Sequence, residues 1–349
     1  MKIQAQIESW LHQQWSKKGV FSLVMRPLSK LARYYIKYQS QQPRAQLPFS
    51  APPIIVVGNI IVGGAGKTPV VLALCEYLKN QGWQPGIISR GYGVTINGPA
   101  RVGQGVLSAA DFGDEPSLIA QQTGVPIAVH PQRVQALTAL CQQHPEVNVV
   151  IADDGLQHQA LPRDIEIIVQ DQRGIGNGLV LPAGPLREPP SRLQHADWLI
   201  TQLPALSPMP ATPAPATANR SVTMCLQATQ MQQLYTGKRL TFSDWLAQYR
   251  QCSMTALAAI GQPQRFFSML EQAGLQLEQC IAHADHHPIA ASTFSQQTAS
   301  ILLITAKDAV KCTDISDPRI WVVHVTPQFT PSTWLVDLEQ KLHELTLLG

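Results

Sequence analysis

The 349-residue chain has few cysteines and no C-x-x-C pair. Its six cysteines are far apart in the sequence, at Cys75, Cys141, Cys225, Cys252, Cys280 and Cys312. This spacing argues against a disulfide framework and is typical of reduced, mostly buried thiols in a cytosolic compartment. No internal repeat is found, which argues against a repeat architecture.

The chain also lacks an apolar run that could cross a bilayer. The run Val20–Met25 is far shorter than the roughly 20 residues that a span needs, and no small-residue cleavage site follows it. Instead, residues 1–38 place aromatic and aliphatic side chains between lysines and arginines. This pattern predicts an N-terminal amphipathic helix in an anionic membrane interface, divided into two pieces at Pro27. A helix packed on the protein's own core is the alternative.

Charge is scarce, since only 14% of the residues are charged, and it is unevenly distributed. Residues 1–50 contain eight Lys or Arg and one acid, whereas the whole chain carries only +3, so the other 299 residues carry −4. A net negative body is not expected to coat nucleic acid. We therefore expect an anionic membrane surface as a partner, no nucleic acid, and no obligate protein partner.

The most informative segment is IIVVGNIIVGGAGKT, residues 54–68. A β-branched run leads into a glycine-rich turn, and an apolar helical pattern follows, which is the context of a phosphate-binding loop (P-loop). Its backbone N–H groups would bind phosphate oxygens, Lys67 would reach the β- and γ-phosphates, and the Thr68 hydroxyl would bind Mg²⁺. The first glycine of the usual motif is missing, because Ile61 occupies its place.

A second acidic signal follows the apolar strand at residues 148–152, where Asp153 and Asp154 stand side by side. An aspartate at a strand end downstream of a P-loop is typical of a Walker B magnesium site, although a solvated turn is the alternative. Further strands are expected at residues 84–90, 126–129, 166–170 and 198–201, with helices at 69–81, 116–123 and 131–143. This alternation predicts a doubly wound parallel sheet whose loops meet at the carboxyl ends of the strands.

Two further polar clusters are candidates for chemistry. Asp114 and Glu115 precede a proline, so they either cap a helix or supply a carboxylate to an acceptor hydroxyl, and both can hold together. The segment His283-Ala284-Asp285-His286-His287 has no further ligand with metal-site spacing, which makes zinc the weaker interpretation. A histidine–carboxylate proton relay and a plain polar loop remain open.

The organisation along the chain predicts four parts. Residues 1–38 form the membrane-associating helical segment and residues 39–203 the P-loop domain. Residues 204–250 form a connector, which contains five prolines between positions 204 and 219 and then two segments, 221–227 and 238–242, that could pair as a ribbon. Residues 251–349 form a second, smaller α/β domain, with strands at 254–260, 277–282, 301–305 and 319–325 and helices at 264–272 and 332–347.

In these motifs the chain resembles the tetraacyldisaccharide 4'-kinases, the lipid A 4'-kinases of Gram-negative bacteria. The resemblance runs from about residue 20 to about residue 315, and it rests on VVGNIIVGGAGKTPVV (56–71), SRGYG (89–93), GDEP (113–116), DDGLQH (153–158), RDIEI (163–167), GNGLVLPAGPLREP (176–189), AAIGQPQRFF (258–267), DHH (285–287) and TAKDAVK (305–311). The family also lacks a glycine where this chain has Ile61. One departure is Ala306, where the family usually has glutamate.

The resemblance implies an α/β kinase that uses ATP and Mg²⁺. Its acceptor is the 4'-hydroxyl of a tetraacylated glucosamine disaccharide 1-phosphate, a lipid A precursor. It implies a peripheral or monotopic place at the cytoplasmic face of the inner membrane. Carried over residue by residue, the resemblance assigns nucleotide binding to Gly63, Gly64, Ala65, Gly66, Lys67 and Thr68, and catalysis to Asp114 and His286. It assigns metal binding to Thr68, Glu115, Asp153 and Asp154. It assigns substrate contacts to Arg90, Arg187 and His287.

Two other functions stay open from the residues alone. One is a P-loop GTPase or ATPase regulator or metallochaperone. Guanine readers usually carry Asn-Lys-x-Asp, and the nearest string here, residues 305–308, has its lysine one place late. The other is a non-catalytic membrane adaptor that binds a nucleotide only as a structural ligand.

Overall fold

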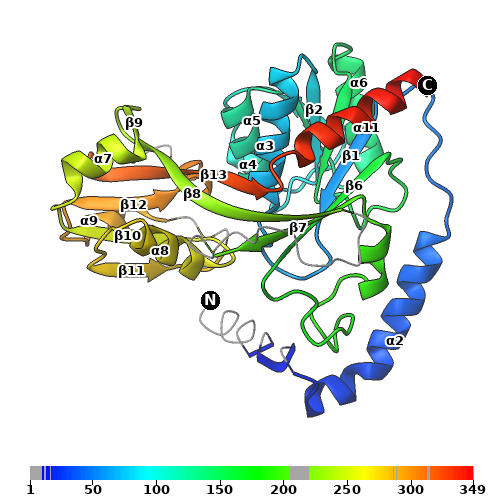
Figure 1. Ribbon diagram of the computed structural model, residues 1–349, viewed down its shortest axis with the longest axis horizontal. Coiled ribbons are helices and arrows are strands. Elements are labelled where there is room, and N and C mark those ends of the chain that lie inside the picture. The colour runs from blue at the N-terminus through cyan, green and yellow to red at the C-terminus, as the bar shows by residue number, and fades with distance from the viewer. Residues whose placement is uncertain are drawn as a thin grey trace.

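The protein is built on one continuous sheet of 13 strands (Figure 1). The computed structural model describes residues 10–11, 13–15, 17–204, 220–285, 287, 289–312 and 315–348. Along the sheet the strands lie in the order β11-β10-β12-β13-β8-β7-β6-β1-β5-β2-β4-β3, and β9 pairs with β8. The α/β fold class predicted from the sequence is confirmed, and the predicted smaller unit continues the sheet of the first.

One end of the sheet, here called the first lobe, consists mainly of parallel strands. These are β1 (Ile54–Gly58), β2 (Pro85–Ser89), β4 (Ile127–Val129), β5 (Val149–Asp153), β6 (Ile165–Asp171) and β7 (Trp198–Leu203), with β3 (Arg101–Gly103) as an antiparallel edge. Its helices are α3 (Lys67–Asn80), α4 (Ala109–Phe112), α5 (Asp114–Thr123), α6 (Arg133–Gln143) and the 3₁₀ helix η1 (Pro190–His195). The run Ile54–Val57 is buried on both faces, as expected for a central parallel strand.

Each face of this part of the sheet carries its own apolar core. On one face, α3, α5 and the C-terminal helix α11 (Trp334–Leu348) pack on alternate strand residues such as Ile55 and Ile151. On the other, α6, η1 and residues 180–186 pack on the residues between them, such as Val56 and Ala152. The helices on both faces therefore fix the parallel strands of the first lobe, whose carboxyl ends lie at one edge of the sheet.

The other end of the sheet, here called the second lobe, is formed by residues 239–312 with parts of two long strands. Its elements are β8 (Ser221–Gln233), β9 (Arg239–Thr241), α7 (Phe242–Tyr249), β10 (Met254–Ala258), α8 (Pro263–Gln272), β11 (Gln279–Ala282), α9 (Ala291–Ser295), β12 (Ile301–Thr305), α10 (Ala306–Ala309) and β13 (Ile320–Thr330). Helices α7 and α8 cover one face, and α9 covers the other.

The long strands β8 and β13 join the two lobes, and Figure 1 shows both strands running from one lobe to the other. The predicted ribbon was partly wrong. Residues 221–227 pair with β7 and β13, and β8 meets β9 only at Gln230–Gln232. The pairing partner β13 lies about 100 residues downstream, which a local pattern does not reveal. The predicted domain limits stay a prediction, although α11, which we assigned to the C-terminal unit, packs on the first lobe.

The N-terminal helix α2 (Val20–Ser40) lies along the outside of the first lobe (Figure 1). The expected division at Pro27 was wrong, because the helix continues through it; a proline removes one backbone hydrogen bond and can be accommodated without ending a helix. Its buried residues are Ser22 and Ser29, and Ser29 donates a hydrogen bond to the carbonyl oxygen of Val180 at 2.7 Å. On the same side Ala32 and Ile36 pack against the apolar core, so α2 contacts the body through both polar and apolar side chains.

Candidate functional site

The predicted site residues of the first lobe lie at one edge of the sheet. Strands β1, β5 and β2 are parallel neighbours, and each ends where a predicted site segment begins. The glycine-rich loop follows β1, Asp153 ends β5 with Asp154 directly after it, and Arg90 follows β2. The structure thus brings together segments that are up to about 100 residues apart, at the edge where parallel sheets bind ligands.

The glycine-rich loop, residues 59–66, is held from inside by Asn59. This fully buried side chain donates hydrogen bonds to the carbonyl oxygens of Ile61 at 2.7 Å and Gly63 at 3.0 Å. Gly66 ends the loop with φ of 87°, a left-handed conformation that favours glycine, and α3 starts at the next residue. Ile61 is buried and bridges to Leu186, which explains why an apolar residue stands there.

Lys67 is the first residue of α3, and its ammonium lies between the loop and β5. Its Nζ is 3.4 Å from Asn59 Oδ1 and 3.4 Å from Asp154 Oδ1. Arg187 Nη1 lies 3.2 Å from both oxygens of Asp154. Burial raises the pKa of the Asp154 carboxyl, but the charges of Lys67 and Arg187 outweigh this effect, and its net pKa lies below the usual value. The two cations therefore keep Asp154 ionised.

Asp153 sits deeper and differs in charge state. It is 1% exposed, it accepts a hydrogen bond from Ser89 Oγ at 3.3 Å, and its Oδ1 has no hydrogen-bond partner among the described residues. Burial and the negative charge of Glu115 raise its pKa to about 7. A buried, unsatisfied carboxylate oxygen is costly, and a nearby cation would remove the cost.

The raised pKa of Asp153 predicts a pH-dependent stability. The folded state holds this proton up to about pH 7, while an unfolded aspartate loses it near pH 3.8, so the stabilisation is present below pH 3.8 and is lost as the pH rises to 7. Without nucleotide or metal, we expect Asp153→Asn to be more stable than the wild type at pH 8, by at most about 4 kcal/mol. Thermal unfolding at pH 4.5 and 8 measures this gain, which should shrink at the lower pH.

Asp317 offers a control of opposite sign. Hydrogen bonds from Arg319 hold its pKa below the usual value. Asp317→Asn is therefore expected to lower stability at pH 8 and to matter less as the carboxyl protonates in acid. Equal pH responses of the two variants would contradict the assignment of a buried proton to Asp153.

Asp114 and Glu115 open helix α5, and Gly113 fixes their place. Gly113 has φ of 93°, and a Cβ there would lie 2.8 Å from the carbonyl oxygen of Tyr92, so the turn after β2 passes directly over the start of α5. The same turn and Pro131 line a cavity of about 450 Å³ that begins at Arg90. An exposed arginine, a roomy polar hollow and Asp114 thus adjoin one another.

The second lobe reaches this edge through the segment of α10. Lys307 Nζ is 2.9 Å from Glu115 Oε1 and 3.3 Å from Asp285 Oδ1, and Lys311 Nζ is 3.8 Å from Asp114 Oδ2. Burial lowers the pKa of Lys307, but the charges of Glu115 and Asp285 outweigh burial and raise it. Both acidic residues at the start of α5 are therefore paired with lysines of the other lobe.

The histidine segment lies beside these lysines. Lys311 Nζ donates to the carbonyl oxygen of His287 at 3.4 Å, and the rings of His283 and His287 stack with centroids 5.9 Å apart. Asp285 Oδ2 and the backbone N of Gly64 would lie 3.1 and 3.3 Å from a Cβ at Gly261, so this lobe also touches the glycine-rich loop. His286, the predicted partner of Asp114, lies outside the described residues.

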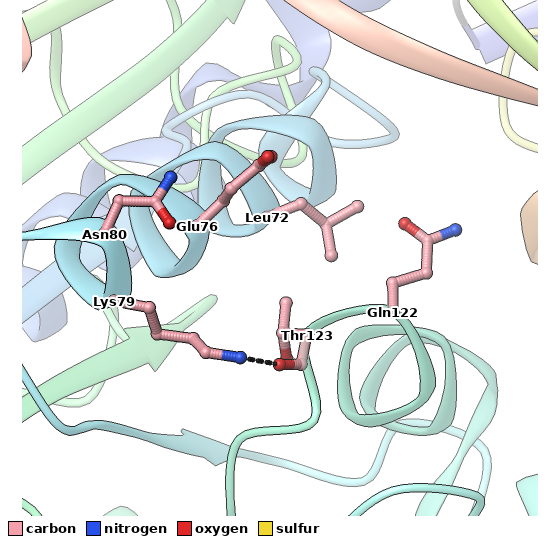
Figure 2. Close-up of a pocket in the computed structure, with 6 residues that line it drawn as sticks. All are labelled: Leu72, Glu76, Lys79, Asn80, Gln122 and Thr123. Atoms are coloured by element: carbon pink, nitrogen blue, oxygen red, sulfur yellow. Dashed lines mark hydrogen bonds between the residues drawn. The ribbon is translucent and has the colours of Figure 1, made fainter.

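A second hollow of about 270 Å³ lies away from this edge. Figure 2 shows the side chains that line it. It is lined by the end of α3 and the end of α5, where Lys79 donates to the carbonyl oxygen of Thr123 at 2.6 Å. Lys67 and Asp114 begin the same two helices, and α3 alone is about 20 Å long. The hollow contains none of the predicted site residues.

Sequence reasoning gave no role to several residues that organise the site. Gln157 accepts from Arg187 Nη1 at 3.0 Å and donates to Glu188 Oε1 and to the carbonyl oxygen of Asn59. Lys307 pairs with Glu115 from the other lobe. Each of these residues lies in a motif quoted for its resemblance, so the signal was present, but only the fold gives each its partner.

Comparison with known proteins identifies the family. The family model of tetraacyldisaccharide-1-P 4'-kinase matches residues 21–343. The tetraacyldisaccharide 4'-kinase of Bordetella parapertussis is 48% identical over 318 residues, covering 90% of this chain and 91% of that protein. The enzyme of that name from Bordetella petrii is 43% identical over 348 residues, covering 99% and 98%.

A solved structure supports the fold. LpxK from Aquifex aeolicus, crystallised in complex with ATP, matches with a TM-score of 0.75 over 92% of this chain and 99% of that one, at 24% identity. The predicted family is thereby confirmed from sequence, and the predicted fold from structure. This chain belongs to the tetraacyldisaccharide-1-P 4'-kinase family.

Proposed function

We propose that this protein transfers the γ-phosphoryl group of ATP to the 4'-hydroxyl of a tetraacylated glucosamine disaccharide 1-phosphate, a step of lipid A biosynthesis. Its family membership over residues 21–343 carries the kinase activity. The arrangement of Lys67, Asp154 and Asp114 around one sheet edge supports it, because phosphoryl transfer requires phosphate binding, charge neutralisation and a base at one point.

On the nucleotide side, Gly63 to Thr68 would bind the ATP phosphates. The loop leads into α3, so its N–H groups and the positive end of the helix face the same space. Lys67 is already directed there by Asn59 and Asp154. Binding of the γ-phosphate would give its ammonium a second anion, in place of or beside Asp154.

The donors near the loop fit Mg²⁺. Thr68, Asp153, Asp154 and Glu115 offer oxygen ligands, and Asp153 Oδ1 is a buried oxygen without a partner among the described residues. No group of three or more His, Cys, Asp or Glu within the described ranges could hold a metal alone. This suits Mg²⁺, which commonly takes one or two carboxylates and completes its shell with water and phosphate. When bound, the ion would neutralise charge on the transferring phosphoryl group.

On the acceptor side, Asp114 would accept the proton of the sugar hydroxyl, with His286 as its proposed partner. Arg90 and the cavity beside it would receive the phosphorylated disaccharide, because a guanidinium binds phosphate in a bidentate way. Arg187 and His287 would contact phosphate or sugar from either side. The ion pairs of Asp114 with Lys311 and of Glu115 with Lys307 join the two lobes at the start of α5.

The two other functions are not favoured. In the string of residues 305–308, the Asp308 carboxylate is fully buried and accepts hydrogen bonds from Ala259 N and Thr305 Oγ1, while Lys307 pairs with Glu115 and Asp285. Neither side chain is available to read guanine. A non-catalytic adaptor would not need a base at Asp114. ATP-dependent transfer of labelled phosphate to the disaccharide lipid tests the proposal. Release of phosphate from GTP with no transfer to the lipid would favour the GTPase alternative.

We further propose that α2 attaches the protein to the cytoplasmic face of the inner membrane. No helix in the described part of the chain is long and apolar enough to cross a bilayer. On α2, however, apolar side chains face outward: Leu23 is 59% exposed, Leu31 67% and Tyr34 73%. Arg26, Lys30, Arg33 and Lys37 are exposed among them. This is the composition of an interfacial helix, and it supports a membrane contact by the outward side of α2, while Ala32 and Ile36 on the other side pack on the core.

The membrane proposal predicts a selective loss of vesicle binding. Changing Leu23, Leu31 and Tyr34 together to serine should weaken binding to anionic vesicles about 100-fold, at roughly 1 kcal/mol for each partly inserted side chain. Co-sedimentation at low and high salt measures it, since each Lys or Arg near the surface adds about 1 kcal/mol that salt screens. Activity on detergent-dispersed lipid should be kept.

A matched control changes three apolar side chains that are equally exposed elsewhere, Val106, Tyr235 and Leu347, to serine. This variant should bind vesicles like the wild type. If both variants bind equally well, α2 is not the membrane contact.

A further inference from the structure

Asp171, the last residue of β6, is a buried carboxylate on which two arginines converge. Its side chain is 0% exposed. Arg173 Nε donates to its two oxygens at 3.0 and 2.9 Å, and the backbone N of Arg173 donates to Oδ1 at 2.9 Å. From α8 of the second lobe, Arg265 Nη2 lies 2.7 Å from Oδ2, and Gln262 Nε2 donates to the same oxygen at 3.3 Å. None of these residues has a role in the function proposed above.

The other end of the Arg173 guanidinium holds the glycine-rich loop. Nη1 donates to the carbonyl oxygen of Val62 at 3.2 Å, and Nη2 donates to that of Gly64 at 3.2 Å. In a trans peptide the C=O and the N–H point in opposite directions. Holding these two carbonyl oxygens toward Arg173 therefore turns the N–H groups of Gly63 and Ala65 away from it, into the concave side where a phosphate would bind.

We propose that Arg173, held in place by Asp171, is a positioning residue that fixes the phosphate-binding loop in its anion-binding conformation. Arg265 connects the pair of Asp171 and Arg173 to the second lobe. Its ion pair with Asp171 forms only when α8 lies against the first lobe. The inference rests on the proposed assignment of the loop to ATP, and it adds residues that act behind the loop, through its carbonyl groups.

The same device occurs a second time in the chain, away from the loop. Asp317 and Arg319 repeat the Asp-x-Arg spacing: the backbone N of Arg319 donates to Asp317 Oδ1 at 2.9 Å, and Arg319 Nε donates to the same oxygen at 3.0 Å. The Arg319 guanidinium then donates to the carbonyl oxygens of Gln297 at 2.7 Å and Phe294 at 3.1 Å. In both places an aspartate orients an arginine that ties down a neighbouring loop, which supplies a matched control.

Steady-state kinetics of the full chain with ATP and detergent-dispersed lipid tests the proposal. Arg173→Ala should raise the KM for ATP about 10- to 100-fold, the range expected for losing hydrogen bonds to a charged group, and leave the KM for lipid unchanged. Arg173→Lys keeps the charge opposite Asp171 but cannot reach both carbonyl oxygens, so it should fold like the wild type and still raise the KM for ATP about tenfold. Arg319→Ala should lower the melting temperature without changing the KM for ATP.

Arg265 adds a coupling test. Since Arg265 reaches the loop only through Asp171 and Arg173, the losses from Arg173→Ala and Arg265→Ala should be non-additive in the KM for ATP. An unchanged KM for ATP in Arg173→Lys, or equal shifts in the KM values for ATP and lipid, would overturn the proposal. Lys67→Ala distinguishes failure of this proposal from failure of the loop assignment. If Lys67→Ala also leaves ATP binding and turnover intact, the assignment of the loop to ATP is wrong. If Lys67→Ala abolishes turnover while Arg173→Lys leaves the KM for ATP unchanged, only the proposed role of Arg173 is wrong.

Discussion

Replacing Asp114 with asparagine should lower kcat by about 10²- to 10⁴-fold, while the affinity for ATP stays nearly unchanged. The amide keeps the size of the carboxylate and its place in the first turn of α5 but accepts no proton from the sugar hydroxyl. Because Gly113 fixes the turn before α5, the side chain should stay in place. Initial rates with saturating ATP and lipid, together with ATP titration calorimetry, separate the catalytic loss from binding.

Asp111→Asn is the matched control for this change. Asp111 lies three residues upstream on α4, its side chain is 62% exposed, and it pairs only loosely with Arg101 at 3.9 Å. Its replacement should leave kcat within about twofold, as surface substitutions commonly do. A similar loss in both variants would mean that the acidic surface, and not one base, matters.

The proposed partner His286 can be tested with the same assay. His286→Ala should lower kcat and alter the acidic limb of the pH–rate profile. If the two residues act as one unit, the double variant should be little worse than the more damaging single one. Losses that multiply would argue for separate roles.

Much of the fold could be predicted because its signals are local. The buried runs at Ile54–Val57 and residues 148–152, each followed by turn chemistry, predicted β1 and β5 nearly to the residue. Helix α8 was predicted at residues 264–272 and begins at Pro263. The long-range pairing of β8 with β13 was not predicted, because strand partners depend on the whole sheet and on no local pattern.

At the site, the sequence indicated residue types at strand ends, and the parallel sheet brought those types together. The sequence did not indicate which oppositely charged side chain pairs with each of these residues. That Lys307 pairs with Glu115, or that Asp153 is buried while Asp154 faces two cations, depends on a few ångströms of packing between lobes. Helix α2 gives the converse case, since its outward apolar face was legible in the sequence while its continuity through Pro27 was not.

Lys67→Ala should reduce kcat/KM by about 10²- to 10³-fold, roughly 3–4 kcal/mol of transition-state stabilisation. The ammonium is held between Asn59 and Asp154 at the start of α3, so it needs little movement to reach a phosphate on the loop. Thr68→Ala should instead weaken the response to Mg²⁺, because it removes a neutral oxygen ligand and no charge. Turnover measured across a magnesium titration distinguishes the two variants.

The control for this prediction lies on the same helix. Lys79 is in the last turn of α3, and its ammonium donates to the carbonyl oxygen of Thr123. Lys79→Ala removes an equal charge at the far end of the helix, where no phosphate is expected, and it should cost little activity. Because Asp154 keeps Arg187 when Lys67 is lost, the Lys67 variant should remain folded. Wild-type turnover in a folded Lys67→Ala protein would therefore refute the phosphate-binding role of the loop.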